Sequence, residues 1–97
     1  MASQSESPGI TLLVTDDRPI YVKFAETMLE NGAYGIVTTM DGASCMKTAK
    51  RLNPDLILLD VIMTGINGFE VCRILKQDME AKDIPIIFVT VEIGTGR

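Results

Sequence analysis

Acidic side chains stand at the ends of two apolar runs in this sequence. Asp16 and Asp17 follow the first run, and Asp60 follows the four large apolar residues 56–59. A charged carboxylate is costly to desolvate, so we expect these acids at the mouths of buried strands, where open α/β sheets bind ligands. A third apolar run ends in Thr90. If these strands are neighbours in a parallel sheet, the polar side chains converge on one edge.

Carboxylates gathered in one place repel one another, so such a cluster must bind a cation or retain a proton. Oxygen ligands with open coordination positions suit Mg²⁺, which keeps several waters and binds phosphate oxygens. The chain contains no histidine, which makes zinc and histidine-based catalysis poor fits. Beside Mg²⁺, Asp60 can attack phosphorus and form an aspartyl phosphate, with the Thr90 hydroxyl donating to a phosphoryl oxygen.

Each of these residues also has a purely structural interpretation. Asp16 and Asp17 could cap the helix that follows them, because a carboxylate interacts favourably with a helix N-terminus. Asp60 could cap the loop after its strand, and Thr90 could be an ordinary strand residue. The joint pattern, rather than any single residue, favours a site for metal and phosphate.

The rest of the chain supplies the elements that would position these residues. We predict strands over residues 10–15, 35–40, 56–60 and 85–90, and helices over residues 19–31, 43–52 and 68–79. On the third helix, the spacing places Cys72, Leu75 and Met79 toward the core. This alternation predicts an α/β fold with a mostly parallel sheet, right-handed crossovers and helices on both faces.

Composition narrows the class of protein. The 97 residues are expected to form one domain over residues 10–97, after a disordered lead-in over residues 1–9 that lacks a signal sequence. A net charge of -4 argues against a nucleic-acid surface, and no apolar run is long enough to span a membrane. Cys45 and Cys72 are not spaced as a metal pair and are interpreted as small apolar residues, which favours a reducing, cytoplasmic setting.

Three segments together resemble the receiver domain of two-component response regulators. They are the Asp16-Asp17 pair after an apolar strand, residues 58–70 with the sequence LLDVIMTGINGFE, and residues 85–90 with the sequence PIIFVT. The resemblance covers residues 10–90 in unbroken order. It implies a flavodoxin-like, doubly wound parallel sheet in the strand order 2-1-3-4-5.

The resemblance also implies roles for individual residues. Asp60 would be the phosphoacceptor, and Thr90 the hydroxyl that turns toward the phosphoryl group. Asp17 and Asp60 would bind Mg²⁺ directly, Asp16 mainly through water, and Ile62 through its backbone carbonyl. The donor would be a phosphohistidine on a sensor histidine kinase or a histidine phosphotransfer protein. The chain would then be no ordinary enzyme, but an acceptor domain that assists its own phosphotransfer and dephosphorylation.

The sequence departs from the family pattern in three places. Thr64 stands where the family usually has proline, for which we expect only a local change in the loop. Val91 follows the threonine where a smaller residue is usual. The sequence also ends before the expected fourth helix, the fifth strand with its phosphoryl-binding lysine, and the fifth helix. We therefore expect an incomplete receiver domain with strand order 2-1-3-4, little stable phosphorylation in this form, and a homodimer or larger assembly through the fourth strand or exchange of elements.

Two other functions compete with phosphoryl acceptance. One is a protein-interaction module, a pseudo-receiver, that works without phosphorylation. The other is a phosphatase with an aspartate nucleophile, which ranks last because such enzymes usually need a second Asp where this chain has Ile62. Labelling by a phosphoryl donor that depends on Mg²⁺ would separate a receiver from an interaction module.

Overall fold

The computed structural model describes residues 9–28 and 34–89. Strands and helices alternate in these residues: β1 (Ile10–Thr15), α1 (Pro19–Met28), β2 (Tyr34–Thr39), α2 (Gly42–Leu52), β3 (Leu56–Asp60), α3 (Gly68–Lys76) and β4 (Ile86–Val89). The strands are parallel and lie in the order β2-β1-β3-β4, so the predicted α/β fold and strand order are confirmed. No helix in these two segments is both long enough and apolar enough to cross a bilayer.

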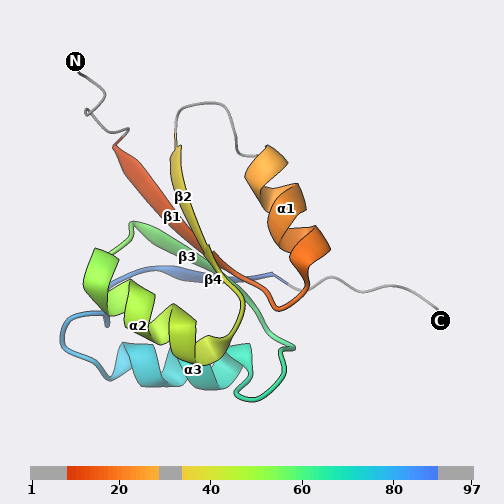
Figure 1. The fold of residues 1–97 in the computed structure, drawn as a ribbon. Coiled ribbons are helices and arrows are strands. Elements are labelled where there is room, and N and C mark those ends of the chain that lie inside the picture. Colours follow the sequence, from red (N-terminus) through yellow and green to blue (C-terminus); the bar gives the residue numbers. More distant parts are fainter. Residues whose placement is uncertain (1–8, 29–33, 90–97) are drawn as a thin grey trace.

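The sheet lies between two helical layers, with α1 on one face and α2 and α3 on the other (Figure 1). The core is on the α2 and α3 side. There, Leu13 of β1 and Ile57 and Leu59 of β3 pack with Val71 and Leu75 of α3, and all five side chains are buried. The unbroken apolar run of β3 therefore has the role expected of a central strand in a parallel sheet, because its neighbours and helices cover both faces.

Helix α2 begins and ends at residues that satisfy its terminal backbone groups. The Asp41 carboxylate accepts a hydrogen bond from the Ser44 N–H at 2.7 Å, which caps the N-terminus. Asn53 takes the left-handed conformation with φ of 51°, and its N–H donates to the Ala49 carbonyl at 2.9 Å. Such a residue ends a helix, and here it turns the chain into β3.

Helix α3 ends earlier than predicted, and this part of the prediction was wrong. The helix stops at Lys76. The following turn is held by the Asp78 carboxylate, which accepts from the Glu80 N–H at 2.8 Å. This local hydrogen bond competes with continued helix, so Met79 does not face the core and is 81% exposed. All other predicted ends of strands and helices that fall within the described residues agree with the structure to within one residue. The predicted ends at 31 and 90 lie outside the described residues.

Strand β4 forms one edge of the described sheet and carries exposed apolar side chains. Ile87, Phe88 and Val89 are 51%, 38% and 39% exposed. The Phe88 ring packs edge to face against the ring of Phe69 at the start of α3, with 4.9 Å between the ring centroids. In the part of the chain that the structure describes, β3 is the only strand paired with β4. Among the described residues, β4 therefore combines an edge without a second paired strand and exposed apolar side chains, which is a feature that favours association.

Candidate functional site

The structure brings Asp16, Asp17 and Asp60 together at the carboxyl end of the sheet. One carboxylate oxygen from each residue lies within 4.8 Å of the others. Asp16 directly follows β1, and its N–H donates to the Thr39 carbonyl at the end of β2 at 3.2 Å. Asp60 is the last residue of β3. The acids converge because β1 and β3 are parallel neighbours, as the sequence predicted.

A close contact with α3 fixes the backbone of Asp60. The N–H of Gly68, the first residue of α3, donates to the Val61 carbonyl at 2.8 Å. A Cβ atom built on Gly68 would overlap the Asp60 carbonyl oxygen and crowd the Val61 Cα. The glycine is therefore required for close approach between the helix and the end of β3, and not merely for a turn.

This contact predicts that Gly68→Ala is destabilising. The added methyl group must push against backbone rather than a flexible side chain, so we expect a loss of about 1–3 kcal/mol in the free energy of unfolding. Chemical denaturation of the wild-type chain and the variant measures it. Gly9→Ala is the matched control, because a Cβ atom there has no neighbour within 4 Å. A fully stable Gly68→Ala chain would contradict the proposed contact.

Arg18 is part of the acidic cluster, although the sequence did not identify it. Its Nε and Nη2 donate to the two carboxylate oxygens of Asp16 at 3.0 and 3.2 Å. The same Nη2 lies 3.1 Å from Asp60 Oδ2. One guanidinium therefore bridges the carboxylates at the ends of two strands. The sequence does show a cationic residue directly after the acid pair. It does not show which way the side chain of that residue points.

Asp60 is held in an unfavourable electrostatic environment. It is 2% exposed, and this burial, followed by the charge of Asp16, raises the pKa of its carboxyl group. The charge of Arg18 and a hydrogen bond from the Ile62 N–H act in the opposite direction. Although Arg18 Nη2 is near, no hydrogen bond of good geometry reaches Asp60 Oδ2 in the described residues. A buried carboxylate oxygen without an aligned donor is the kind of group that a cation would stabilise.

Asp17 is anchored from the loop after β3. Thr64 donates to Asp17 Oδ2 twice, from its backbone N–H at 2.8 Å and from its hydroxyl at 3.0 Å. These bonds, with the backbone N–H first, lower the pKa of the Asp17 carboxyl group. Proline, the residue that the family pattern leads one to expect here, has neither donor. The departure at Thr64 thus has a specific consequence, which the sequence alone did not reveal.

The Thr64 contacts predict a shift in the titration of Asp17. Thr64→Pro removes both donors, so the pKa of Asp17 should rise toward its ordinary value of 3.8. Thr64→Ser retains both donors and is the matched control, with a pKa close to that of the wild-type chain. Carbon-detected NMR titration of the Asp17 carboxyl group measures the three values. An equal Asp17 pKa in the proline and serine variants would contradict this assignment.

Of the remaining residues considered at the site, two lie outside the described residues and one lies beside Asp60. Thr90 and Val91 lie outside the described residues. The last residue of β4, Val89, is in register with Asp60 on the neighbouring strand. The Ile62 side chain is 72% exposed and its N–H bonds to Asp60, whereas the role of its carbonyl as a metal ligand stays a prediction.

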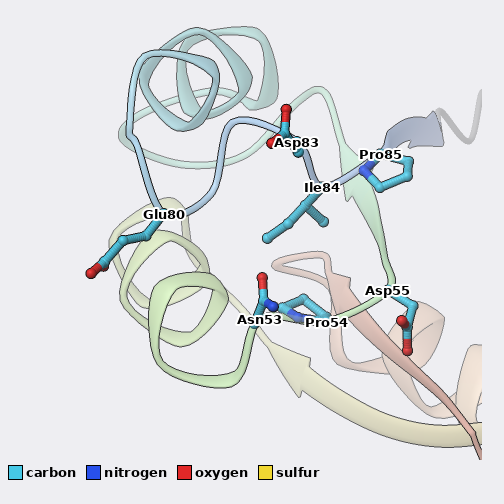
Figure 2. A pocket seen from close by; sticks show the side chains of 7 residues that line it. All are labelled: Asn53, Pro54, Asp55, Glu80, Asp83, Ile84 and Pro85. Carbon is cyan, nitrogen blue, oxygen red and sulfur yellow. The ribbon is translucent and has the colours of Figure 1, made fainter.

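A separate hollow lies at the opposite end of the sheet, where β3 and β4 begin (Figure 2). Its volume is about 410 Å³, and it is lined by Asn53, Pro54, Asp55, Glu80, Asp83, Ile84 and Pro85. None of the predicted site residues borders it. One of its acids already has a structural role, since Asp55 accepts from the Thr11 N–H at 2.8 Å. The acidic cluster, and not this hollow, is therefore the candidate site.

Sequence comparison relates the chain to bacterial response regulators. The family model described as "Response regulator receiver domain" matches residues 12–95. Response regulator PleD of Caulobacter vibrioides is 42% identical over 85 residues, which cover 88% of this chain and 19% of PleD. The chain thus spans about a fifth of the length of that relative.

Structural comparison leads to the same family. The N-terminal domain of a response regulator receiver protein from Methanoculleus marisnigri JR1 is 37% identical, with a TM-score of 0.82 over 90% of this chain and 71% of that one. The receiver domain of sensor histidine kinase PA1611 from Pseudomonas aeruginosa PAO1, described with a magnesium ion coordinated in its active site cleft, is 26% identical. Its TM-score is 0.77 over 82% of this chain and 66% of that one. With its sheet order, its acidic cluster and these matches, the chain belongs to the response regulator receiver domain family of two-component signalling.

Proposed function

We propose that this chain accepts a phosphoryl group on Asp60 and that phosphorylation changes its interactions with a partner or output module. The Asp60 carboxylate is the observation that carries this proposal. It ends β3, is 2% exposed, and has one oxygen without a well-aligned hydrogen-bond donor. Such an arrangement costs stability, so a role in chemistry accounts for it better than a role in packing.

The proposed reaction is a transfer from a phosphohistidine. An Asp60 oxygen forms a bond to phosphorus as the phosphorus–nitrogen bond breaks, and the leaving imidazole nitrogen keeps the bonding electron pair and takes up a proton from water. The product is an acyl phosphate. Attack by water on phosphorus later cleaves the new bond and returns the carboxylate and inorganic phosphate. Thr90 is proposed to donate its hydroxyl to a phosphoryl oxygen, and the chain thereby assists its own phosphorylation and dephosphorylation.

The acidic cluster fits a magnesium ion. One carboxylate oxygen from each acid lies within 4.8 Å of the others, and Asp60 Oδ2 is buried without a hydrogen-bond partner. We propose that Asp17 and Asp60 bind the ion directly, Asp16 through water, and Ile62 through its carbonyl. Bound Mg²⁺ would neutralise negative charge on the phosphoryl oxygens. The magnesium ion described for the PA1611 receiver domain supports this assignment.

Labelling with a small phosphoryl donor tests the proposal. In a version of the chain that continues through the fifth strand, we expect acetyl phosphate with Mg²⁺ to add one base-labile phosphoryl group, and none when Asp60→Asn is introduced into it. Asp83→Asn, an exposed acid far from the cluster, is the control and should label like the wild-type chain. Intact-mass spectrometry before and after base treatment compares the three. Equal labelling of wild type and Asp60→Asn would refute Asp60 as the acceptor.

The natural donor is proposed to be a sensor histidine kinase or a histidine phosphotransfer protein, and the site of action to be cytoplasmic. The domain itself is not proposed to bind nucleic acid, given its net charge of -4. An interaction module that works without phosphorylation is the second candidate. The Arg18 ion pairs favour it, because they give the acids a role in the metal-free chain. Labelling that requires Mg²⁺ would exclude this second candidate.

We also propose that the chain associates with itself through β4. The described edge of this strand combines available backbone groups with exposed Ile87, Phe88 and Val89. A second copy can satisfy both by pairing along that edge.

A further inference from the structure

The Arg18 guanidinium contacts two of the three carboxylates of the candidate metal cluster. It contacts both oxygens of Asp16 at 3.0 and 3.2 Å, and Asp60 Oδ2 at 3.1 Å. Asp16 and Asp60 supply two of the three carboxylates that make up the candidate metal cluster. The cluster thus already holds one positive charge, provided by the chain itself.

A guanidinium and a divalent ion cannot share these carboxylates. The acid oxygens lie within 4.8 Å of one another, so both cations would be held a few ångströms apart in a partly buried site and would repel strongly. The Asp60 side chain is 2% exposed and ends a central strand, so it cannot move away. The Arg18 side chain is 33% exposed and has a flexible stem, so its head group can move into solvent.

We propose that Arg18 is a built-in competitor of the divalent cation. It pairs with Asp16 and Asp60 when no metal is bound, and it moves outward when the ion binds. This inference rests on the proposed binding of Mg²⁺ at the same cluster. Because only the open form accepts the ion, the apparent affinity for Mg²⁺ is lowered by the fraction of time that the site is open. Binding of the ion and release of Arg18 are then a single coupled event.

The backbone of Arg18 allows its side chain to be tested separately. The Arg18 N–H donates to Asp16 Oδ1 at 3.0 Å, and this bond does not involve the guanidinium. Asp16 therefore keeps a local partner in Arg18→Ala. The variant removes the competing charge while it leaves the three carboxylates and this backbone contact in place.

Titration with MgCl₂ of the metal-free full chain tests the proposal. We follow backbone amide signals by NMR and binding heat by calorimetry. If Arg18 closes the site about nine-tenths of the time, Arg18→Ala should bind Mg²⁺ about tenfold more tightly than the wild-type chain. Arg51→Ala, which removes an exposed arginine from α2, is the matched control and should bind like wild type.

The outcomes separate this inference from the proposed function. Wild-type binding with equal or weaker affinity in Arg18→Ala overturns the competitor role and leaves the metal site intact. Failure of both chains to bind Mg²⁺ overturns the metal site as well.

A second measurement uses the wild-type chain and does not depend on the folding of a variant. We expect the Nε–H signal of Arg18 to move at saturating Mg²⁺ toward the position of an exposed arginine such as Arg51. An unchanged Arg18 signal in the Mg²⁺-bound chain would show that the guanidinium stays on Asp16, which overturns the proposal.

Discussion

Asp60→Asn is expected to raise the stability of the metal-free chain near neutral pH. The wild-type carboxylate is buried, lies beside Asp16, and has an oxygen without an aligned donor. Relief of such a buried, poorly satisfied group is worth about 1–3 kcal/mol in the free energy of unfolding. The substitution that abolishes the proposed chemistry therefore strengthens the fold.

The stability difference between the wild-type chain and Asp60→Asn should depend on pH. The pKa of Asp60 is raised above its ordinary value of 3.8, so the folded chain binds a proton more readily than the unfolded chain. The free energy of unfolding of the wild-type chain therefore falls as the pH rises from 3.8 through the raised pKa of Asp60. This pH dependence is absent in Asp60→Asn, which has no carboxyl group at that position. The two unfolding free energies should be similar in acid and should diverge as the pH increases.

Denaturation with urea at several pH values, in the presence of a chelator, measures this difference. Asp83→Asn is the control, because its side chain is 92% exposed and should change stability little at any pH. Added Mg²⁺ should stabilise the wild-type chain more than Asp60→Asn, since a ligand that binds the folded state stabilises it. An Asp60→Asn chain less stable than wild type at neutral pH without metal would contradict the electrostatic account.

The second large effect concerns association through β4. We expect the average mass of the wild-type chain to rise with concentration toward a dimer or larger species. Ile87→Lys should weaken this association more than about tenfold, because a lysine on an edge strand opposes pairing with another chain. Ile87 is 51% exposed, so the lysine adds little strain to the monomer.

Light scattering over a dilution series measures this association. Met79→Lys is the matched control, since Met79 is 81% exposed but lies in the turn after α3 and is not part of β4. It should associate like the wild-type chain. A wild-type chain that stays monomeric at every concentration would exclude the interface, and equal effects of the two lysines would place it elsewhere.

The fold was largely predictable because its signals are local. The apolar runs of β1 and β3 and the helical spacing between them determine a parallel α/β sheet once the rules of chain crossover are applied. The end of α3 was not predictable from periodicity. The apolar spacing continues to Met79, but the helix ends at Lys76, and in the turn beyond it the Asp78 carboxylate accepts from the Glu80 N–H. A local side-chain hydrogen bond of this kind favours a turn over continued helix, and the apolar Met79 has no core to pack against.

The site was predictable only where strand ends determine it. Asp16, Asp17 and Asp60 converge because the strands are parallel and adjacent. The contacts of Arg18 and Thr64 depend instead on side-chain direction and on how the loop after β3 folds back. Thr64 reaches an acid 47 positions earlier in the chain. No spacing rule connects two such positions before the tertiary structure is known.

The hydrogen bond from the Thr64 N–H also has a kinetic consequence. Thr64 is an exposed loop residue, and its amide would exchange with solvent quickly if Asp17 did not accept from it. We expect its exchange rate to follow local opening of the loop after β3 rather than global unfolding. Hydrogen exchange at this single amide therefore measures how often the contact between Thr64 and Asp17 opens, and it needs no substitution.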